Sequence, residues 1–267
     1  MDARPDLVAQ LSSYMPIATQ AMDIASEIVT QLPSAVDAKG DRDMVSDVDV
    51  QIERAVRAYL GEHTPEIGFL GEETGDAPGS SGLQWVLDPI DGTANFVKGI
   101  PLYAISLALA TRQEPALGII DVPADGSRYM AALGWGSFCG DEPLQVRPAA
   151  DLKEAIVTFG DYAVGEQAEA KNEARLVVTS RLAQRAQRVR MLGSAAIDLA
   201  WLAHGRTDAA IIFGGHPWDT AAGLILVREA GGSVVDARGQ RHKLGSASTL
   251  AASPELLDQV LGVVPRP

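Results

Sequence analysis

Two carboxylates stand three residues apart in the stretch Trp85-Val86-Leu87-Asp88-Pro89-Ile90-Asp91-Gly92-Thr93-Ala94-Asn95-Phe96. The apolar start predicts the end of a buried strand, and because Pro89 cannot donate to a sheet, we expect the chain to leave the sheet there. Gly92 permits unusual backbone angles, and Thr93 or Asn95 can cap a following helix. Acids beside exposed N–H groups suit hard cations and phosphate, although the same stretch alone is equally typical of an ordinary turn.

A second pair of acids follows another predicted strand. Ile67 to Leu70 reads as a short strand that runs into Gly71-Glu72-Glu73-Thr74. Adjacent glutamates are usually solvated, but both strand ends fall within 20 residues of each other, with a loop at 78–82 between them. We therefore expect the two strands to be neighbours in one sheet and their acids to meet.

Three predicted helix starts carry further candidates. Asp49 matches the capping pattern that begins at Ser46, so a structural role is its default. Gly193-Ser194-Ala195-Ala196 offers N–H groups to an anion or a hydroxyl-rich ligand, or is simply a closely packed cap. Asp219 complements the dipole at the start of the next helix. The nearby His216 has no second histidine spaced to form a zinc site, so hydrogen bonding within its loop is expected.

Periodicity divides the chain into two parts. Residues 1–148 predict an α+β domain, with helices at about 7–32 and 46–61, a polar loop at 34–43 and strands at 104–110, 116–122 and 128–133 in an antiparallel meander. Residues 149–267 alternate strand and helix and predict an α/β domain: strands at 155–159, 188–191, 208–213 and 233–236, helices at 166–179, 194–203 and 219–230.

Composition narrows the classes of function. The chain has 267 residues, 46% apolar and 21% charged, which is typical of a globular protein. No apolar run is long enough for a membrane span and no leader pattern opens the chain, so we expect a soluble cytoplasmic protein. One cysteine, Cys139, allows no internal disulfide. The net charge of −13 argues against nucleic acid as a ligand but not against a small anion that binds through cations.

These segments together closely resemble the inositol monophosphatase family in order and spacing. The resemblance rests on Gly71-Glu72-Glu73, on the stretch from Trp85 to Phe96, and on Trp218-Asp219-Thr220-Ala221-Ala222-Gly223 followed by Glu229-Ala230-Gly231-Gly232. Asp43-Met44-Val45-Ser46-Asp47-Val48-Asp49 and the Gly193 segment match two weaker motifs of that family. The resemblance covers nearly the whole chain and implies a layered α-β-α-β-α fold, Mg²⁺-dependent hydrolysis of a small phosphate monoester, and a homodimer.

Carried over by position, the resemblance assigns the site residues. Glu72, Thr93 and Asp49 would be catalytic, with Asp49 acting through waters. The metal ligands would be Glu72, Asp88, Asp91, Asp219 and the carbonyl of Ile90; the substrate-binding residues would be Gly92, Thr93, Gly193, Ser194, Ala195 and Asp219. Lys39 falls about where the family has a loop lysine near the metals, in a loop that is one residue shorter here.

Two positions depart from the family pattern. Many members that act on inositol phosphate have a glutamate where this chain has Ile212, and Ala94 replaces a common second threonine. Because an isoleucine accepts no hydrogen bond from a sugar hydroxyl, histidinol phosphate, fructose bisphosphate and 3′-phosphoadenosine nucleotides stay open as substrates. A phosphatase-like regulatory or binding protein is the alternative from another class.

Overall fold

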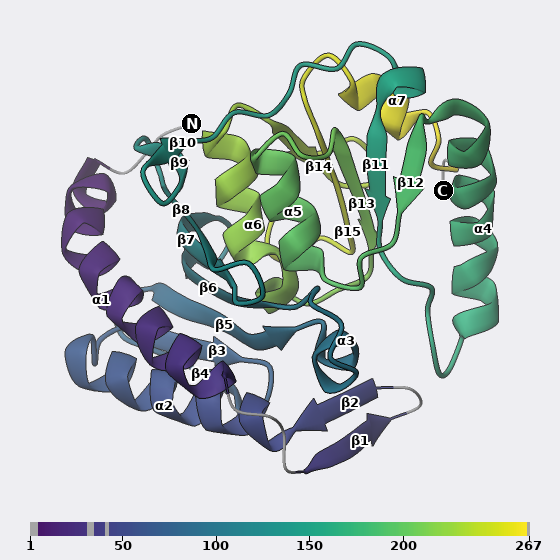
Figure 1. The fold of residues 1–267 in the computed structure, drawn as a ribbon. Coiled ribbons are helices and arrows are strands. Elements are labelled where there is room, and N and C mark those ends of the chain that lie inside the picture. Colours follow the sequence, from purple (N-terminus) through teal and green to yellow (C-terminus); the bar gives the residue numbers. More distant parts are fainter. Residues whose placement is uncertain (1–4, 31–34, 41–42, 266–267) are drawn as a thin grey trace.

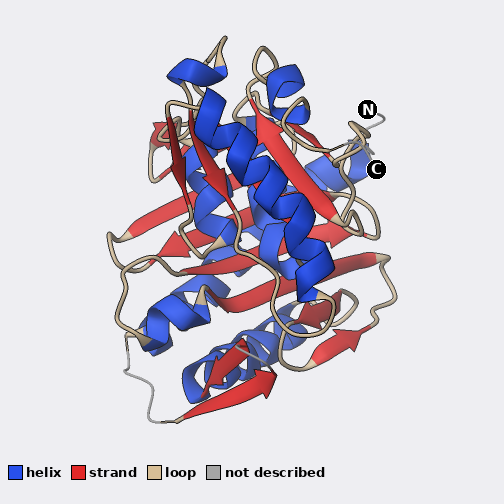
Figure 2. Cartoon of the chain, turned by 90° about the vertical axis from the view of Figure 1, so that its right-hand side faces the viewer, coloured by secondary structure: helices blue, strands red, loops and turns tan. Residues whose placement is uncertain are grey.

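The computed structural model describes residues 5–30, 35–40 and 43–265 and arranges them in five layers (Figure 1). Helices α1 and α2 cover the outer face of a first sheet, α5 and α6 fill the space between the two sheets, and α4 and α7 cover the outer face of the second. Figure 2 shows the same alternation of helices and strands from the side. The predicted α-β-α-β-α layering is therefore confirmed.

The helices are α1 (Pro5–Val29), α2 (Asp47–His63), α3 (Thr93–Val97), α4 (Ala168–Arg185), α5 (Ala195–Ala203), α6 (Pro217–Glu229), α7 (Leu257–Leu261) and the 3₁₀ turn η1 (Leu152–Glu154). The strands are β1 (Val36–Gly40), β2 (Asp43–Ser46), β3 (Gly68–Gly71), β4 (Gly75–Ala77), β5 (Leu83–Asp91), β6 (Ala104–Thr111), β7 (Pro115–Val122), β8 (Ser127–Ala132), β9 (Gly136–Cys139), β10 (Glu142–Pro143), β11 (Ile156–Phe159), β12 (Arg188–Arg190), β13 (Ala209–Phe213), β14 (Ser233–Val235) and β15 (Ser248–Ala252).

The first sheet has eight strands in the order β10-β9-β8-β7-β6-β5-β3-β4. Strands β6, β7 and β8 form the predicted antiparallel meander, which β5, β9 and β10 extend, and β3 lies parallel to β5 with Gly71 opposite Leu87. The expected meeting of the two acid-bearing strand ends is thus confirmed.

Small residues on one face of this sheet admit helix α6. In β6 the large side chains of Ile105, Leu107 and Leu109 belong to the core under α1 and α2, while Ala104, Ala108 and Ala110 belong to the core around α5 and α6. In β7 a Cβ added to Gly118 would lie 2.8 Å from Cα of Ala222 in α6, a distance that side chains do not tolerate. This close approach packs the middle of α6 directly against β7.

The expectation that the chain leaves the sheet at Pro89 was wrong. Strand β5 continues to Asp91, with Asp88 opposite Ser106 and Asp91 opposite Ala104. Three steps along β5 match two along β6, so one extra residue forms a bulge between the acids. A bulge leaves its extra residue out of the ladder, which is why a proline without an N–H group is tolerated there.

The second sheet has five strands in the order β12-β11-β13-β15-β14, with β11, β12 and β13 parallel and β15 antiparallel to both of its neighbours. The carboxyl ends of β11 and β13 therefore point in one direction. Strand β15 and helix α7 were not predicted. Nor was the hairpin of β1 and β2, which occupies most of the stretch predicted as a polar loop and pairs Val36 with Ser46.

Helices α5 and α6 join the two predicted parts of the chain. Their buried side chains form one apolar cluster with residues of both sheets, from Val86 in β5 to Ala251 in β15. Arg147, just before the predicted boundary, donates through Nε and Nη2 to the fully buried carboxylate of Asp208 at 2.7 and 2.6 Å. The division at residues 148 and 149 itself stays a prediction.

Candidate active site

The floor of the site is the carboxyl end of β5. The side chains of Asp88 and Asp91 are 2% and 9% exposed, so both acids are buried. Oδ1 of Asp88 accepts from the backbone N–H of Ile90 at 3.1 Å, which fixes its carboxyl group across the bulge. Asp88, Asp91 and the backbone of Ile90 thus lie together at the carboxyl end of β5.

The start of α5 holds Asp91. Oδ2 of Asp91 accepts from the backbone N–H of Ala196 at 2.6 Å and from the hydroxyl of Ser194, which also accepts from the N–H of Ile197 as the cap of the helix. The Ser194 side chain is buried and oriented by this acid. Ser194 therefore ties the second half of the chain to the floor of the site, while Ala195 stays partly exposed at the rim.

A hydroxyl links α3 to α2. Oγ1 of Thr93 lies 3.0 Å from the carbonyl oxygen of Ile90 and 3.3 Å from Oδ1 of Asp49, and it can donate to either. Asp49 is 1% exposed, and its Oδ2 accepts from the N–H and hydroxyl of Ser46 at 3.0 and 2.5 Å. The predicted capping box is present, and its carboxylate also reaches the site.

A further acid, Asp219, stands in the first turn of α6. Oδ2 of Asp219 accepts from the N–H of His216 at 2.6 Å. The imidazole of His216 stacks on the indole of Trp218 with 4.4 Å between ring centroids. A Cβ added to Gly215, whose φ is 96°, would lie 2.9 Å from the same oxygen of Asp219, so the loop needs glycine at this position.

The five acids of the site act on one another through their charges. Burial raises the pKa of Asp88 well above its usual value, and the negative charges of Glu72, Asp91 and Asp219 raise it further. Burial and the charge of Asp219 raise the pKa of Asp91 to about 7, against hydrogen bonds that lower it. Burial likewise raises the pKa of Asp49, and Glu72 contributes to this. Glu72, Asp91 and Asp219 thus gather around Asp88, and the charge of Glu72 also acts on Asp49.

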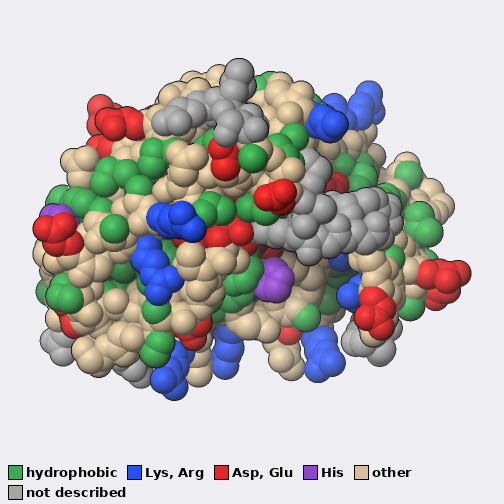
Figure 3. Space-filling view, turned by 90° about the horizontal axis from the view of Figure 1, so that it is seen from below, with side chains coloured by type: hydrophobic (Ala, Val, Ile, Leu, Met, Phe, Trp, Pro, Cys, Tyr) green, Lys and Arg blue, Asp and Glu red, His purple; other side chains and the backbone are tan. Residues whose placement is uncertain are grey.

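The residues of the site divide into a floor and a rim. Asp49, Asp88, Ile90 and Asp91 are buried, while the rim is partly exposed and comprises Glu72, Gly92, Thr93, Gly193, Ala195 and Asp219. Acidic side chains lie close together near the middle of the face at the bottom of Figure 1, as Figure 3 shows. Among the described residues, no group of three or more Asp, Glu, His or Cys side chains is already arranged so that it could hold a metal ion.

Two positioning residues were missing from the sequence-based prediction. Nδ2 of Asn95 donates to the carbonyls of Leu102 and Leu192 at 2.7 and 2.8 Å, joining the loop after α3 to the loop before α5. The fully buried Glu53 accepts from the N–H groups of Glu73 and Thr74 at 2.8 and 2.6 Å and so shapes the turn that carries Glu72. A signal for Glu53 existed, because it is an acid one helical turn after Asp49.

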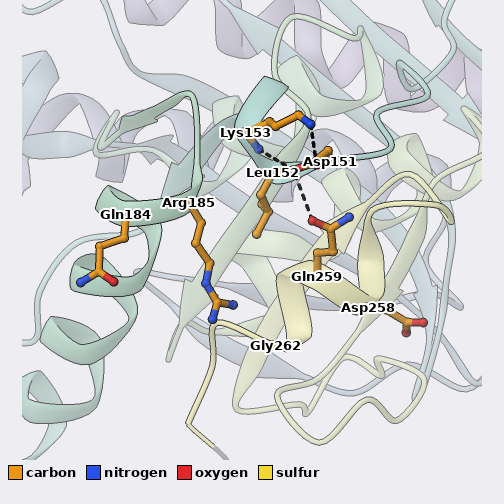
Figure 4. Close-up of a pocket in the computed structure, with 8 residues that line it drawn as sticks. All are labelled: Asp151, Leu152, Lys153, Gln184, Arg185, Asp258, Gln259 and Gly262. Atoms are coloured by element: carbon orange, nitrogen blue, oxygen red, sulfur yellow. Dashed lines mark hydrogen bonds and ion pairs between the residues drawn. The ribbon is translucent and has the colours of Figure 1, made fainter.

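Other positions lie apart from this cluster. The side chain of Lys39 falls outside the described residues. Ile212 is 6% exposed in the core beside α5, next to the strand end that leads to Asp219. A polar pocket of about 550 Å³ between η1, α4 and α7, where Gln259 accepts from the N–H of Leu152 at 3.2 Å, shares no residue with the acids (Figure 4). It lies at the amino end of β11, whereas the acids lie near the carboxyl end of β13.

Comparison with known proteins identifies relatives along the whole chain. Residues 10–265 match the inositol monophosphatase family. The chain is 37% identical over 258 residues to the inositol-1-monophosphatase ImpA of Mycolicibacterium smegmatis, covering 96% of this chain and 93% of that protein. It is 34% identical to the fructose-1,6-bisphosphatase/inositol-1-monophosphatase of Thermotoga maritima, covering 84% of each chain.

A solved structure agrees with the fold. The extragenic suppressor protein suhB of Bartonella henselae superposes with a TM-score of 0.87 at 29% identity, covering 94% of this chain and 98% of that one. No helix among the described residues is long and apolar enough to cross a membrane. The sequence match over residues 10–265, together with these relatives, shows that the chain belongs to the inositol monophosphatase family and is a phosphomonoesterase.

Proposed function

We propose that this protein hydrolyses a small, inositol-1-phosphate-like phosphate monoester to its alcohol and inorganic phosphate, using Mg²⁺ and a water as nucleophile. The observation that carries the proposal is the meeting of Glu72, Asp91 and Asp219 around the buried Asp88. Buried like charges cost free energy unless cations or protons neutralise them. A group of acids held together by the ends of two sheets and two helices therefore indicates a cation-binding site.

The donor set fits Mg²⁺. Glu72, Asp88, Asp91 and Asp219 offer carboxylate oxygens, and Ile90 offers a carbonyl, which are the hard ligands that Mg²⁺ prefers. Hydrogen bonds to the protein fix one oxygen each of Asp88, Asp91 and Asp219, which orients the three carboxyl groups in advance. We assign these five groups as the metal ligands.

The reaction requires strong stabilisation of charge, because uncatalysed phosphate monoesters hydrolyse so slowly that accelerations approach ~10²¹-fold. Bound divalent cations would neutralise the phosphate and lower the pKa of water from ~15.7 towards ~7. The hydroxyl of Thr93 contacts both the carbonyl of Ile90 and Asp49, which supports a role in accepting from and orienting the attacking water together with Glu72. A covalent aspartyl-phosphate route is the rival mechanism.

Substrate binding falls to the partly exposed rim. We assign Gly92 and Thr93 to the phosphate, and Gly193, Ser194, Ala195 and Asp219 to the side of the alcohol. A Cβ added to Gly92, whose φ is 89°, would lie 3.0 Å from the carbonyl of Gly193, so the two turns approach each other directly. Because the Ser194 hydroxyl is bonded to Asp91, we expect it to act on the substrate through that acid.

The identity of the alcohol depends on Ile212. A site that hydrogen-bonds a sugar hydroxyl loses about 1–3 kcal/mol when the protein partner is absent. Histidinol phosphate, fructose bisphosphate and 3′-phosphoadenosine nucleotides are therefore competing substrates, and the name of the Thermotoga relative favours fructose bisphosphate among them. A panel of these phosphates with inositol 1-phosphate, assayed by phosphate release with Mg²⁺, would rank them.

Two substitutions test the assigned chemistry. Asp91→Asn and Glu72→Gln should each abolish Mg²⁺-dependent phosphate release and weaken Mg²⁺ binding in calorimetry, while circular dichroism stays unchanged. The same chemical changes at the exposed Asp141 and Glu62 serve as controls and should leave both quantities intact. Robust turnover by Asp91→Asn or Glu72→Gln would refute the assigned roles. If the unmutated protein is folded but binds no Mg²⁺, the regulatory alternative would be favoured instead.

We further propose a cytoplasmic homodimer that binds no nucleic acid. The net charge of −13 disfavours nucleic acid, and the single Cys139 is free, as in a reducing compartment. Leu176 and Val177 are 57% and 41% exposed on neighbouring positions of α4, which supports an association through that helix. Light scattering coupled to gel filtration should give twice the chain mass, and Leu176→Glu should reduce it.

A further inference from the structure

A cleft of about 1030 Å³ opens at the end of α6 that lies farthest from Asp219. Its walls come from the loop between β6 and β7, the last turn of α6, strand β14 and Arg241. Arg228 follows Asp219 by nine positions along α6, which corresponds to a rise of about 14 Å at 1.5 Å per residue. The cleft is therefore a separate feature from the acid cluster, at the opposite end of the same helix.

The polar wall of the cleft carries one more positive than negative charge, with Arg112, Arg228 and Arg241 set against Glu114 and Glu229. Nη1 of Arg228 lies 2.5 Å and Nε of Arg241 2.8 Å from the two carboxylate oxygens of Glu114, so two guanidinium groups share one carboxylate. Arg112 also lines the cleft and makes no ion pair within the part of the chain that the structure describes. In a chain with a net charge of −13, this wall is a local site for an anion.

A second part of the wall is apolar. Leu133 and Leu7 are partly buried there, beside Ile225 and Val234, which are 1% and 5% exposed. An inorganic anion would leave this wall in contact with water, and a purely apolar ligand would desolvate the guanidinium groups without pairing them. The volume is at the upper end of the ~300–1,000 Å³ that small-molecule sites occupy.

Hydrogen bonds hold the polar wall in place. Nη2 of Arg228 donates to the carbonyl of His242 at 2.7 Å, and the N–H of Leu244 donates to the carbonyl of Gln113 at 3.0 Å. These bonds tie the segment around Arg241 to α6 and to the loop between β6 and β7. The cleft is thus formed before any ligand arrives, which reduces the free-energy cost of binding.

We propose that this cleft binds a small amphipathic organic anion, with its acid group on Arg112 and its apolar body against Leu133 and Val234. The assignment does not depend on the reaction at the acid cluster. It accounts for both the polar and the apolar part of the wall, and it identifies the ligand by one feature, an acid group on a hydrocarbon or aromatic body.

Anilinonaphthalene sulfonate, a fluorescent aromatic anion, tests the proposal on the full-length protein. The titration is run with saturating Mg²⁺ and inorganic phosphate, so that the active site is occupied. We expect one saturable site per chain. The affinity for the probe should be at least tenfold lower in Arg112→Glu and unchanged in Arg54→Glu, which makes the same charge change on the exposed face of α2. Octanoate should displace the probe at concentrations at which octanol does not.

Each opposite result overturns the proposal. Equal affinity of the Arg112→Glu and Arg54→Glu variants would place the probe elsewhere, and displacement by raising inorganic phosphate would place it in the active site. Octanol competing as well as octanoate would remove the role of the acid group. Because Arg112 is exposed, its substitution leaves the fold intact, and an unchanged melting temperature in Arg112→Glu verifies this.

Discussion

The side chain of Asn95 offers a sharp test of how the two halves of the site are held together. Its Nδ2 donates to the carbonyls of Leu102 and Leu192, which precede the start of β6 and Gly193 respectively. A Cβ added to Gly193 would lie 2.9 Å from the same nitrogen, so the two loops are in direct contact. Asn95→Ala removes both hydrogen bonds and leaves a gap between the loops.

The magnitude follows from those two bonds. Each contributes about 0.5–1.5 kcal/mol, and a buried carbonyl left without a donor costs ~1–3 kcal/mol, so the loss is about 2–3 kcal/mol. In a domain of this size each kcal/mol lowers the melting temperature by ~2 °C, which predicts a drop of about 4–6 °C. A displacement of ~1 Å between Thr93 and Asp91 should also lower kcat about 100-fold.

Urea unfolding and phosphate release with saturating Mg²⁺ measure the two effects. Asn172→Ala is the matched control, because Asn172 also makes two hydrogen bonds, to the N–H and carbonyl of Ala163 at 2.7 and 3.0 Å. The control should lose similar stability and keep its kcat. If Asn95→Ala loses less than ~0.5 kcal/mol, or if both variants lose kcat equally, the proposed link between the loops is refuted.

Three further predictions concern other parts of the molecule. Glu53→Gln places an N–H₂ group against the N–H of Glu73 or Thr74, so it should cost ~1–3 kcal/mol in urea unfolding and lower kcat more than KM changes. Burial lowers the pKa of His242 to about 4, so the unfolded chain binds more protons than the folded one between pH ~6.5 and ~4. The free energy of unfolding therefore decreases as the pH is lowered through this range. The difference between the unfolding free energies at pH 7 and pH 5 should be ~2 kcal/mol smaller in His242→Gln than in the unmutated protein. An equal difference in both proteins would contradict the lowered pKa of His242. Ile212→Glu should raise kcat/KM on inositol 1-phosphate relative to a phosphate without sugar hydroxyls by about tenfold, and equal changes on both substrates would show that Ile212 does not face the alcohol.

The acids were predictable from the sequence because each follows an apolar strand or begins a helix. An abrupt change from apolar to acidic residues marks a strand end, and parallel neighbours bring such ends together, as β3 and β5 show. Asp219 could be added because it stands at a helix start. In these cases the local sequence itself reports the position of the carboxylate.

The supporting contacts were not predictable in the same way. Asn95 meets Leu192, which is 97 residues away, and nothing near either residue reports the pairing. The hairpin of β1 and β2 has a polar sequence whose pairing is made by the backbone, so it carried no alternating apolar pattern. The sequence therefore predicted the positions of the acids better than the contacts that support them.

The bulge in β5 explains why Asp88 and Asp91 can share one site. In a regular strand, residues three apart point to opposite faces, and Asp91 would turn towards α1 and α2. Val86 faces the core around α5 and α6, and Leu87 faces the core under α1 and α2. Ile90 would be expected on the side of Val86, yet it packs in the core with Leu87, so the one extra residue has reversed the alternation. Asp91 consequently points to α5, where Ser194 and Ala196 hold it beside Asp88. A proline that weakens the ladder at this position is therefore part of the construction of the site, because the irregular step brings both acids to the same face.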